Sequence, residues 1–189
     1  DAELLQDVTF LTGGYPAPYI NRTSSVLQVT QREGSRKEFG GWATLGFAGA
    51  GAIVEGPINI EKGAGKGSWV LSARRSFLDL FTKDVGFGGV PVVYSFNAKA
   101  VYDLTPRDRI WMVNLAGIDE IRLGLTDSTD LEEEIANFDI RYEGWRSATG
   151  FNWQRTFGSR GVGLLGITHS EAKVGQQVKD LVAQGVPPP

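Results

Sequence analysis

Arg74, Lys99 and Trp42 are the candidate ligand-binding residues of this chain, because each is expected on the polar side of a β-strand. Alternate residues of a strand share one face, and polar neighbours stand two positions away, with Ser72 beside Arg74 and Asn97 beside Lys99. The two cations could contact an anionic ligand, or they could pair with carboxylates of the protein itself. Trp42 could pack against a segment that lies on the same face.

Other residue types that often carry catalysis do not form recognisable sites. His169 is the single histidine, and it has no cysteine or nearby carboxylate as a metal-binding or catalytic partner. The glycines around residue 65 do not follow the P-loop order. An acidic run could offer oxygen ligands to Ca²⁺, but it lacks EF-hand spacing and is expected to be a solvated loop: Asp127, Asp130, Glu132, Glu133 and Glu134. We therefore predict no catalytic residue, metal site or cofactor.

Composition limits both the fold and the partners. The 189 residues include 25 glycines and no cysteine, and aromatic residues reach 11%. This mixture favours many strands joined by turns, and the lack of cysteine excludes disulfides and thiolate chemistry. The net charge of −3 provides no global field that would attract nucleic acid.

The segment from Val92 to Tyr102 is the clearest predicted strand. Its even positions are apolar, whereas Ser95, Asn97 and Lys99 are polar, so one face of a long strand would be apolar. At about 3.3 Å per residue, such a strand tilted by about 40° would cross a hydrocarbon layer. Aromatic residues near both ends of the apolar face are typical of the interfaces of a membrane β-barrel.

Seven strands are expected in all, and they occupy residues 39–47, 53–58, 68–77, 92–102, 109–118, 142–157 and 161–171. The stretches between them are expected as a reversal at 48–52, a loop at 61–67, and a polar loop at 121–138 with one helical turn at 131–135. From residue 175 onward we expect loop or helix. Short connections at 105–108 and 158–160 alternate with long ones at 79–90 and 119–138, as in outer-membrane barrels.

Two sets of side chains test this barrel interpretation on the apolar side. Arg75 points to that side and is expected near the outer rim, because a cation in the middle of a bilayer costs about 2–4 kcal/mol. The tryptophans other than Trp42 are expected in interfacial girdles rather than in a sugar-stacking site: Trp69, Trp111, Trp145 and Trp153.

A family resemblance rests on the order of several stretches. DVTFLTGGYPAPYINRTSSVLQVTQREG (Asp7 to Gly34) combines a glycine-rich turn, a tyrosine and a short strand with a polar tail. It resembles the end of the plug domain of TonB-dependent outer-membrane receptors, with these matching residues: Gly13, Gly14, Ala17, Tyr19, Arg22, Ser24, Ser25, Val29 and Glu33. Residues 39–58 resemble the first barrel hairpin, 67–81 the third strand and 102–110 a periplasmic turn. The likeness extends to about Glu171 and is nearest to large barrels with carboxypeptidase-like N-terminal extensions.

The resemblance implies an all-β fold in two parts. Residues 1–34 would be the C-terminal end of a plug domain, and residues 35–189 would be about seven antiparallel strands of a transmembrane β-barrel. Both ends look like cuts through a larger protein, so we expect the remainder of the barrel, or other chains, to complete this segment.

Function and partners follow from the same resemblance. The protein would lie in the bacterial outer membrane, contact its lipid, and reach the TonB complex through the missing N-terminal part. It would bind and import a scarce ligand, such as a siderophore, cobalamin, an oligosaccharide or a peptide. Import of this kind implies no covalent chemistry, so we expect the protein not to be an enzyme. We also expect no nucleic-acid partner.

Two other folds stay open at this stage. A soluble β-sandwich that binds carbohydrate through its tryptophans would also show alternating strands. A small closed barrel of about eight strands would fit the alternation as well, but it would leave the first 34 residues without a role.

Overall fold

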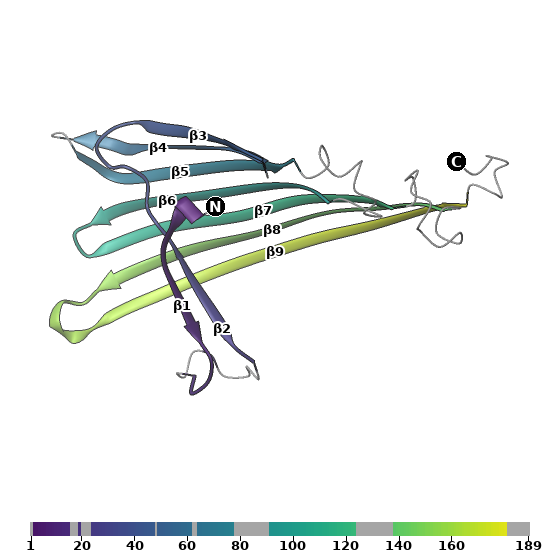
Figure 1. Cartoon of the computed structure of the whole chain (residues 1–189). Helices are drawn as coiled ribbons and strands as arrows, with labels where there is room; N and C mark the ends of the chain where they lie inside the picture. The colour runs from purple at the N-terminus through teal and green to yellow at the C-terminus, as the bar shows by residue number, and fades with distance from the viewer. Residues whose placement is uncertain are drawn as a thin grey trace.

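The protein is all-β in the computed structural model, which describes residues 2–15, 19, 24–47, 49–61, 64–77, 91–123 and 138–180. Its main sheet has seven antiparallel strands whose order in space is their order in the chain (Figure 1). The strands are β3 (Gly40–Gly46), β4 (Gly49–Glu61), β5 (Ala64–Ser76), β6 (Val92–Thr105), β7 (Asp108–Leu123), β8 (Phe138–Thr156) and β9 (Val162–Asp180). The predicted fold class, all-β and antiparallel with seven strands, is confirmed.

A second, two-stranded sheet precedes the main one. A single 3-10 turn, η1 (Ala2–Leu4), leads into β1 (Leu5–Leu11), which pairs antiparallel with β2 (Val26–Gln31). This hairpin crosses one side of the large sheet (Figure 1). Its root, where η1 leads into β1, packs against that side. Leu4 is buried together with Ile53 of β4 and Val70 of β5. We call this side of the sheet the hairpin face.

The hairpin face and the opposite side, which we call the apolar face, differ in chemistry because residues alternate strictly along the paired strands. On β6 the side chain of Lys99 reaches the hairpin, whereas Tyr94 and Phe96 point away from it and are 36% and 42% exposed. The register continues the apolar face across neighbouring strands, as in the row Tyr94, Ile118 and Trp145. No second sheet covers this face within the described residues.

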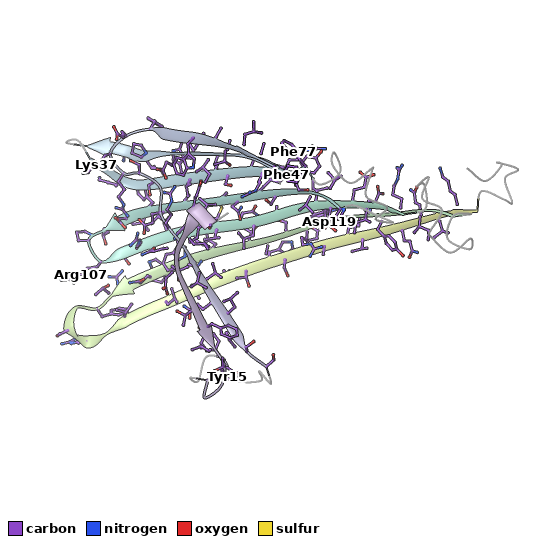
Figure 2. All side chains as sticks on the ribbon, viewed as in Figure 1. Tyr15, Lys37, Phe47, Phe77, Arg107 and Asp119 are labelled. Atoms are coloured by element: carbon purple, nitrogen blue, oxygen red, sulfur yellow. The ribbon has the colours of Figure 1, made fainter. Side chains whose placement is uncertain are left out.

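Two short and two long connections lie at opposite ends of the sheet, but the short β3–β4 connection, between Gly46 and Gly49, shares the end of the long ones. The turns β6–β7 and β8–β9, the latter containing η3 (Gly158–Arg160), are both short and lie at one end (Figure 1). The strand ends that the β5–β6 and β7–β8 connections join, Ser76 with Val92 and Leu123 with Phe138, lie at the other end. Figure 2 accordingly shows Arg107 toward the first end and Phe77 and Asp119 toward the second.

The β6–β7 turn shows how the sequence sets a tight connection. Among the described non-glycine residues only Asn59 has a positive φ, so φ is negative at both Pro106 and Arg107. The turn therefore lacks the positive φ angles that two-residue hairpin loops usually need. A register shift between Asp103 and Thr105 accommodates the difference. The predicted short turn at 105–108 is confirmed.

Four strand boundaries differ from the predictions, each because pairing overrides local composition. The predicted loop at 61–67 is wrong, because β4 runs to Glu61 and β5 begins at Ala64. The predicted reversal at 48–52 is wrong beyond its first residue, because β4 begins at Gly49. The predicted loop at 121–138 is wrong at both ends, where β7 and β8 pair up to Leu123 and Ile140. The predicted loop or helix after residue 175 is wrong, because β9 pairs with β8 as far as Asp180.

Other expectations fall outside the described residues or concern helices. The helical turn expected at 131–135 and the acidic run at 127–134 both lie in residues that the structure does not describe. Among the described residues, no helix has the length and apolar character needed to cross a membrane.

Candidate functional site

The segment that links the hairpin to the sheet is held by charged side chains, beginning with Arg32. Its guanidinium pairs with the carboxylate of Glu55 on β4 and donates hydrogen bonds of 2.9 Å to the backbone oxygens of Glu3 and Glu33. The same guanidinium lies 5.4 Å from the ring centre of Trp42, whose indole N–H donates to the Glu3 carboxylate. One arginine thus joins η1, the linking segment, β3 and β4.

Next to it, two carboxylates and two guanidiniums form a closed set, which we call the charged junction: Glu33, Arg36, Asp103 and Arg109. The Glu33 carboxylate accepts a hydrogen bond of 3.2 Å from the Arg36 guanidinium and another from the Arg109 guanidinium. Asp103 accepts from Arg36 and lies 3.6 Å from the Arg109 guanidinium. The carboxylates of Asp103 and then Glu33 raise the pKa of the Arg36 guanidinium, although partial burial opposes this. The two guanidinium charges thus balance the two carboxylate charges within the junction.

Gly34 lets the linking segment pass close to the sheet. A Cβ built at this position would lie 2.1 Å from the backbone oxygen of Trp69 on β5, far inside van der Waals contact. Any side chain here would push the segment off the sheet. The glycine therefore sets the distance at which Glu33 and Arg36 meet Asp103 and Arg109.

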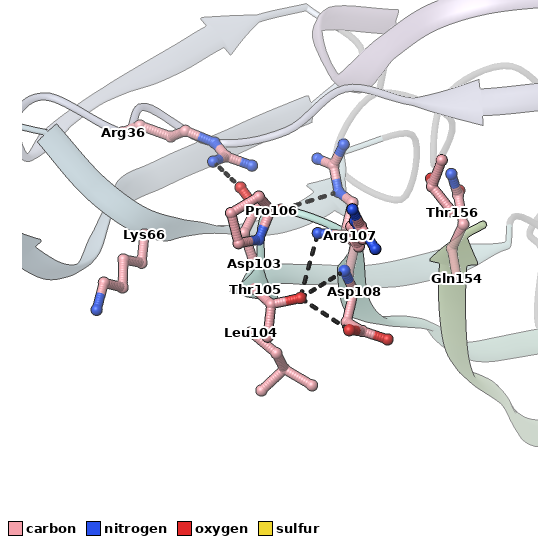
Figure 3. A pocket seen from close by; sticks show the side chains of 11 residues that line it. Arg36, Lys66, Asp103, Leu104, Thr105, Pro106, Arg107, Asp108, Gln154 and Thr156 are labelled. Atoms are coloured by element: carbon pink, nitrogen blue, oxygen red, sulfur yellow. Dashed lines mark hydrogen bonds and ion pairs between the residues drawn. The ribbon is translucent and has the colours of Figure 1, made fainter. Parts of the chain in front are cut away.

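An open hollow of about 570 Å³ adjoins the charged junction at the end of the short turns (Figure 3). Arg36, Asp103 and the residues of the β6–β7 turn are among those that line it. The Thr105 hydroxyl organises this turn: it accepts from the backbone N–H of Arg107 at 3.2 Å and of Asp108 at 3.0 Å, and it donates to the Asp108 carboxylate at 2.7 Å. Asp108 in turn accepts from Trp153 at 3.2 Å.

The predicted binding residues all belong to the sheet, but they do not come together. The Lys99 ammonium donates to the backbone oxygen of Gln31 on the hairpin, and Trp42 contacts the hairpin root, as expected. Arg74 pairs in register with Ser95, four residues along β6 from Lys99, which separates the two residues by about 13 Å along the strand direction. Whether any of the three binds a ligand stays a prediction.

On the apolar face, Arg75 lies as expected one residue before β5 ends. Its guanidinium lies 5.6 Å from the ring centre of Tyr94 and 5.4 Å from that of Phe77, and its Nε donates to the Tyr94 hydroxyl at 3.1 Å. Trp69, Trp145 and Trp153 share this face by register.

Two expectations about single residues are wrong. Trp111 lines a cavity under the hairpin rather than the apolar face, because its register partner is Val101, which is buried on the hairpin face. His169 does have a nearby carboxylate, since its Nε2 lies 3.9 Å from Glu171. The side chains of His169 and Glu171 are both largely exposed. Within the described residues, no group of three potential metal ligands forms.

Sequence reasoning missed the charged junction. Of its four residues, only Glu33 is among the residues that match the resembled family. A local signal existed for one contact, since Asp103 and Arg109 flank a predicted turn and pair across it in register. Contacts of Glu33 and Arg36 with residues about 70 positions away had no signal in the sequence.

Comparison of this chain with protein-family models, with curated proteins and with solved structures gives no match.

Proposed function

We propose that this chain is part of a TonB-dependent outer-membrane receptor, with the end of the plug at residues 1–34 and strands of the barrel wall at residues 35–189. In this role it binds a scarce ligand outside the cell and imports it when the TonB complex displaces the plug. No covalent chemistry is involved, so the protein is not an enzyme.

The observation that carries the proposal is the contrast between the two faces of a single-layer sheet. The hairpin face holds the charged junction and the hairpin, as a barrel lumen would hold a plug. The apolar face is uncovered within the described residues and exposes large side chains, among them Leu71 at 47% and Phe151 at 49%. An uncovered apolar sheet face is unfavourable in water but suits lipid.

Dimensions of the apolar face support the same proposal. On β6 its aromatic residues stand at Tyr94 and Tyr102, and on β8 at Trp145 and Trp153, a separation of about 26 Å along each strand. With strands tilted by about 40°, this separation projects to about 20 Å along the membrane normal, which fits within the apolar band, about 25 Å tall, that outer-membrane barrels carry between aromatic girdles.

Three polar side chains within this band, on β7 and β8, satisfy one another. Asn114 donates to the hydroxyl oxygens of Ser147 at 3.0 Å and Thr149 at 2.7 Å. Mutual hydrogen bonding lowers the cost of placing such groups in hydrocarbon. The trio is therefore compatible with a lipid-facing surface.

Spin labelling in outer-membrane vesicles from cells that produce the protein tests the proposal. Because the chain has no cysteine, single cysteines at Leu71, Tyr94 and Phe96 each carry one nitroxide, and Asn97 on the hairpin face is the matched control. We expect high access to oxygen and low access to a water-soluble nickel chelate at the three sites, and not at Asn97. Aqueous exposure at all four sites, or a buried environment at Phe96 as in a β-sandwich, would overturn the assignment.

A further inference from the structure

Two cross-strand pairs stand next to each other in the open hollow at the end of the short turns. Arg109 on β7 pairs in register with Gln154 on β8. The next pair toward the turn joins Arg107 to Thr156, whose backbone N–H donates to the Arg107 backbone oxygen at 2.8 Å. All four residues line the hollow. Because alternate residues of a strand share one face, the four side chains lie together on the hairpin face.

Strand register sets the spacing of these four side chains. Residues directly opposite in an antiparallel pair have Cβ atoms about 5 Å apart, and alternate residues of one strand are about 7 Å apart. Arg107 and Arg109 therefore form one side of a small rectangle, and Gln154 and Thr156 form the other. In Figure 3, Gln154 and Thr156 stand on one side of Arg107 and Arg36 stands on the other.

Three members of this rectangle have hydrogen-bond donors that are not in use. The guanidinium of Arg107 and the side chains of Gln154 and Thr156 make no hydrogen bond or ion pair with any residue that the structure describes. Arg107 is exposed, and the other two are half-buried. A dissolved molecule can therefore reach all three groups.

The arginine in the fourth position has donors to spare as well. Arg109 donates through Nη2 to Glu33, and its Nε lies 3.6 Å from Asp103, while its Nη1 has no partner among the described residues. A guanidinium carries five N–H donors, and this side chain is 37% exposed. Nη1 of Arg109 is therefore available beside Arg107.

Charge in the rectangle is positive. Within the charged junction the carboxylates are already balanced by guanidiniums, so Arg107 adds a charge that no carboxylate offsets in the described part of the chain. Asp108 also lines the hollow, but its carboxylate accepts from Trp153 at 3.2 Å and from Arg155 at 3.1 Å. Trp153 stands on the apolar face, so the Asp108 carboxylate points away from the rectangle.

We infer that the rectangle binds a phosphate group. Arg107 and Arg109 hold its oxygens from β7 through their guanidinium forks, and the Gln154 amide and the Thr156 hydroxyl donate to it from β8. A tetrahedral oxyanion presents oxygens to both strands, whereas the two oxygens of a carboxylate lie in one plane and reach one strand only. Free phosphate, a soluble phosphate ester and a lipid headgroup all carry this group. The site goes beyond the proposed function, because such binding is a property of the chain whether or not it takes part in import.

Equilibrium dialysis with radiolabelled inorganic phosphate tests the site on the 189-residue chain in a neutral detergent. We expect saturable binding, and acetate should compete about tenfold less well than unlabelled phosphate. Arg107→Gln should weaken phosphate binding about tenfold, and Thr156→Val about fivefold. Arg160→Gln makes the same charge change in the neighbouring β8–β9 turn, outside the hollow, and should leave binding unchanged. Arg107→Lys should fall between the parent and Arg107→Gln, because it keeps the charge but loses the fork.

Competition by two esters distinguishes the sources of the phosphate. Glycerol 3-phosphate and phosphatidic acid in the same micelles carry the same headgroup chemistry, and displacement of phosphate by either supports the site. Stronger displacement by phosphatidic acid assigns the site to a lipid headgroup, and equal displacement assigns it to a soluble molecule.

Three outcomes would overturn the inference: no saturable binding of phosphate by the parent chain, equal competition by acetate and phosphate, or equal phosphate affinity of Arg107→Gln and Arg160→Gln. The Arg107 side chain has no partner to lose within the described residues, so its replacement should leave the fold intact. None of these results depends on which face contacts lipid, so this inference and the proposed function can fail separately.

Discussion

Removing the charge of Glu33 should release the hairpin from the sheet. Its carboxylate accepts from Arg36 at 3.2 Å and from Arg109, and the three side chains are between 31% and 37% exposed. Because they are about one-third exposed, each pair contributes about 1 kcal/mol rather than the value for a buried pair. Glu33→Gln should therefore weaken docking of the hairpin by about 2 kcal/mol, or roughly 30-fold in the docking equilibrium.

Distance measurements between two nitroxides provide the assay. Phe10→Cys on β1 and His169→Cys on β9 are exposed positions in a chain that has no other cysteine. Their distance distribution, followed across a urea series, gives the docked fraction where both states are populated. The Glu33→Gln variant should lose the docked distance at lower urea than the parent.

A matched control separates the junction from a general charge effect. Glu38→Gln makes the same change five residues later, at an exposed side chain, and should leave the docked fraction unchanged. Combining Glu33→Gln with Arg109→Met should cost less than the sum of the two single changes, because both remove the same contact. Equal urea midpoints for Glu33→Gln and Glu38→Gln would refute the role assigned to the charged junction.

Two further predictions concern the elements that position the junction. Gly34→Ala should displace the hairpin in the same distance assay, because its Cβ would lie 2.1 Å from the Trp69 backbone oxygen. Gly40→Ala is the control and should not displace the hairpin, because the space around Gly40 is open. Equal distance distributions for the two variants would contradict the close approach. Thr105→Val should lower the free energy of unfolding by about 1–2 kcal/mol, because it removes the hydroxyl that three hydrogen bonds share in the β6–β7 turn, and Thr105→Ser should restore it. Urea unfolding of the three proteins measures this, and a Thr105→Val midpoint equal to that of the parent would show that the hydroxyl does not stabilise the turn.

Strands and their faces could be predicted from local pattern alone. A period of two is a property of consecutive residues, so Val92 to Tyr102 identifies both a strand and its apolar side without knowledge of its neighbours. The same logic placed Arg75 and Arg74 on opposite sides of β5. It failed for Trp111, because the alternation around this residue has large apolar side chains on both faces of β7 and gives no direction.

Tertiary structure determines where the strands end and which distant side chains contact one another. Composition alone suggested a loop after residue 175, yet the hydrogen bonds offered by β8 extend β9 to Asp180. Glu33 meets Arg109 only because the linking segment after β2 crosses β4 to β7, and Gln31 and Lys99 line one cavity because the hairpin docks beside that segment. Sequence by itself determined which residues share a strand face, because that depends on the spacing of neighbours along the chain. Which distant residues face one another depends on strand register and on where the hairpin docks, and both arise from contacts between segments far apart in the sequence.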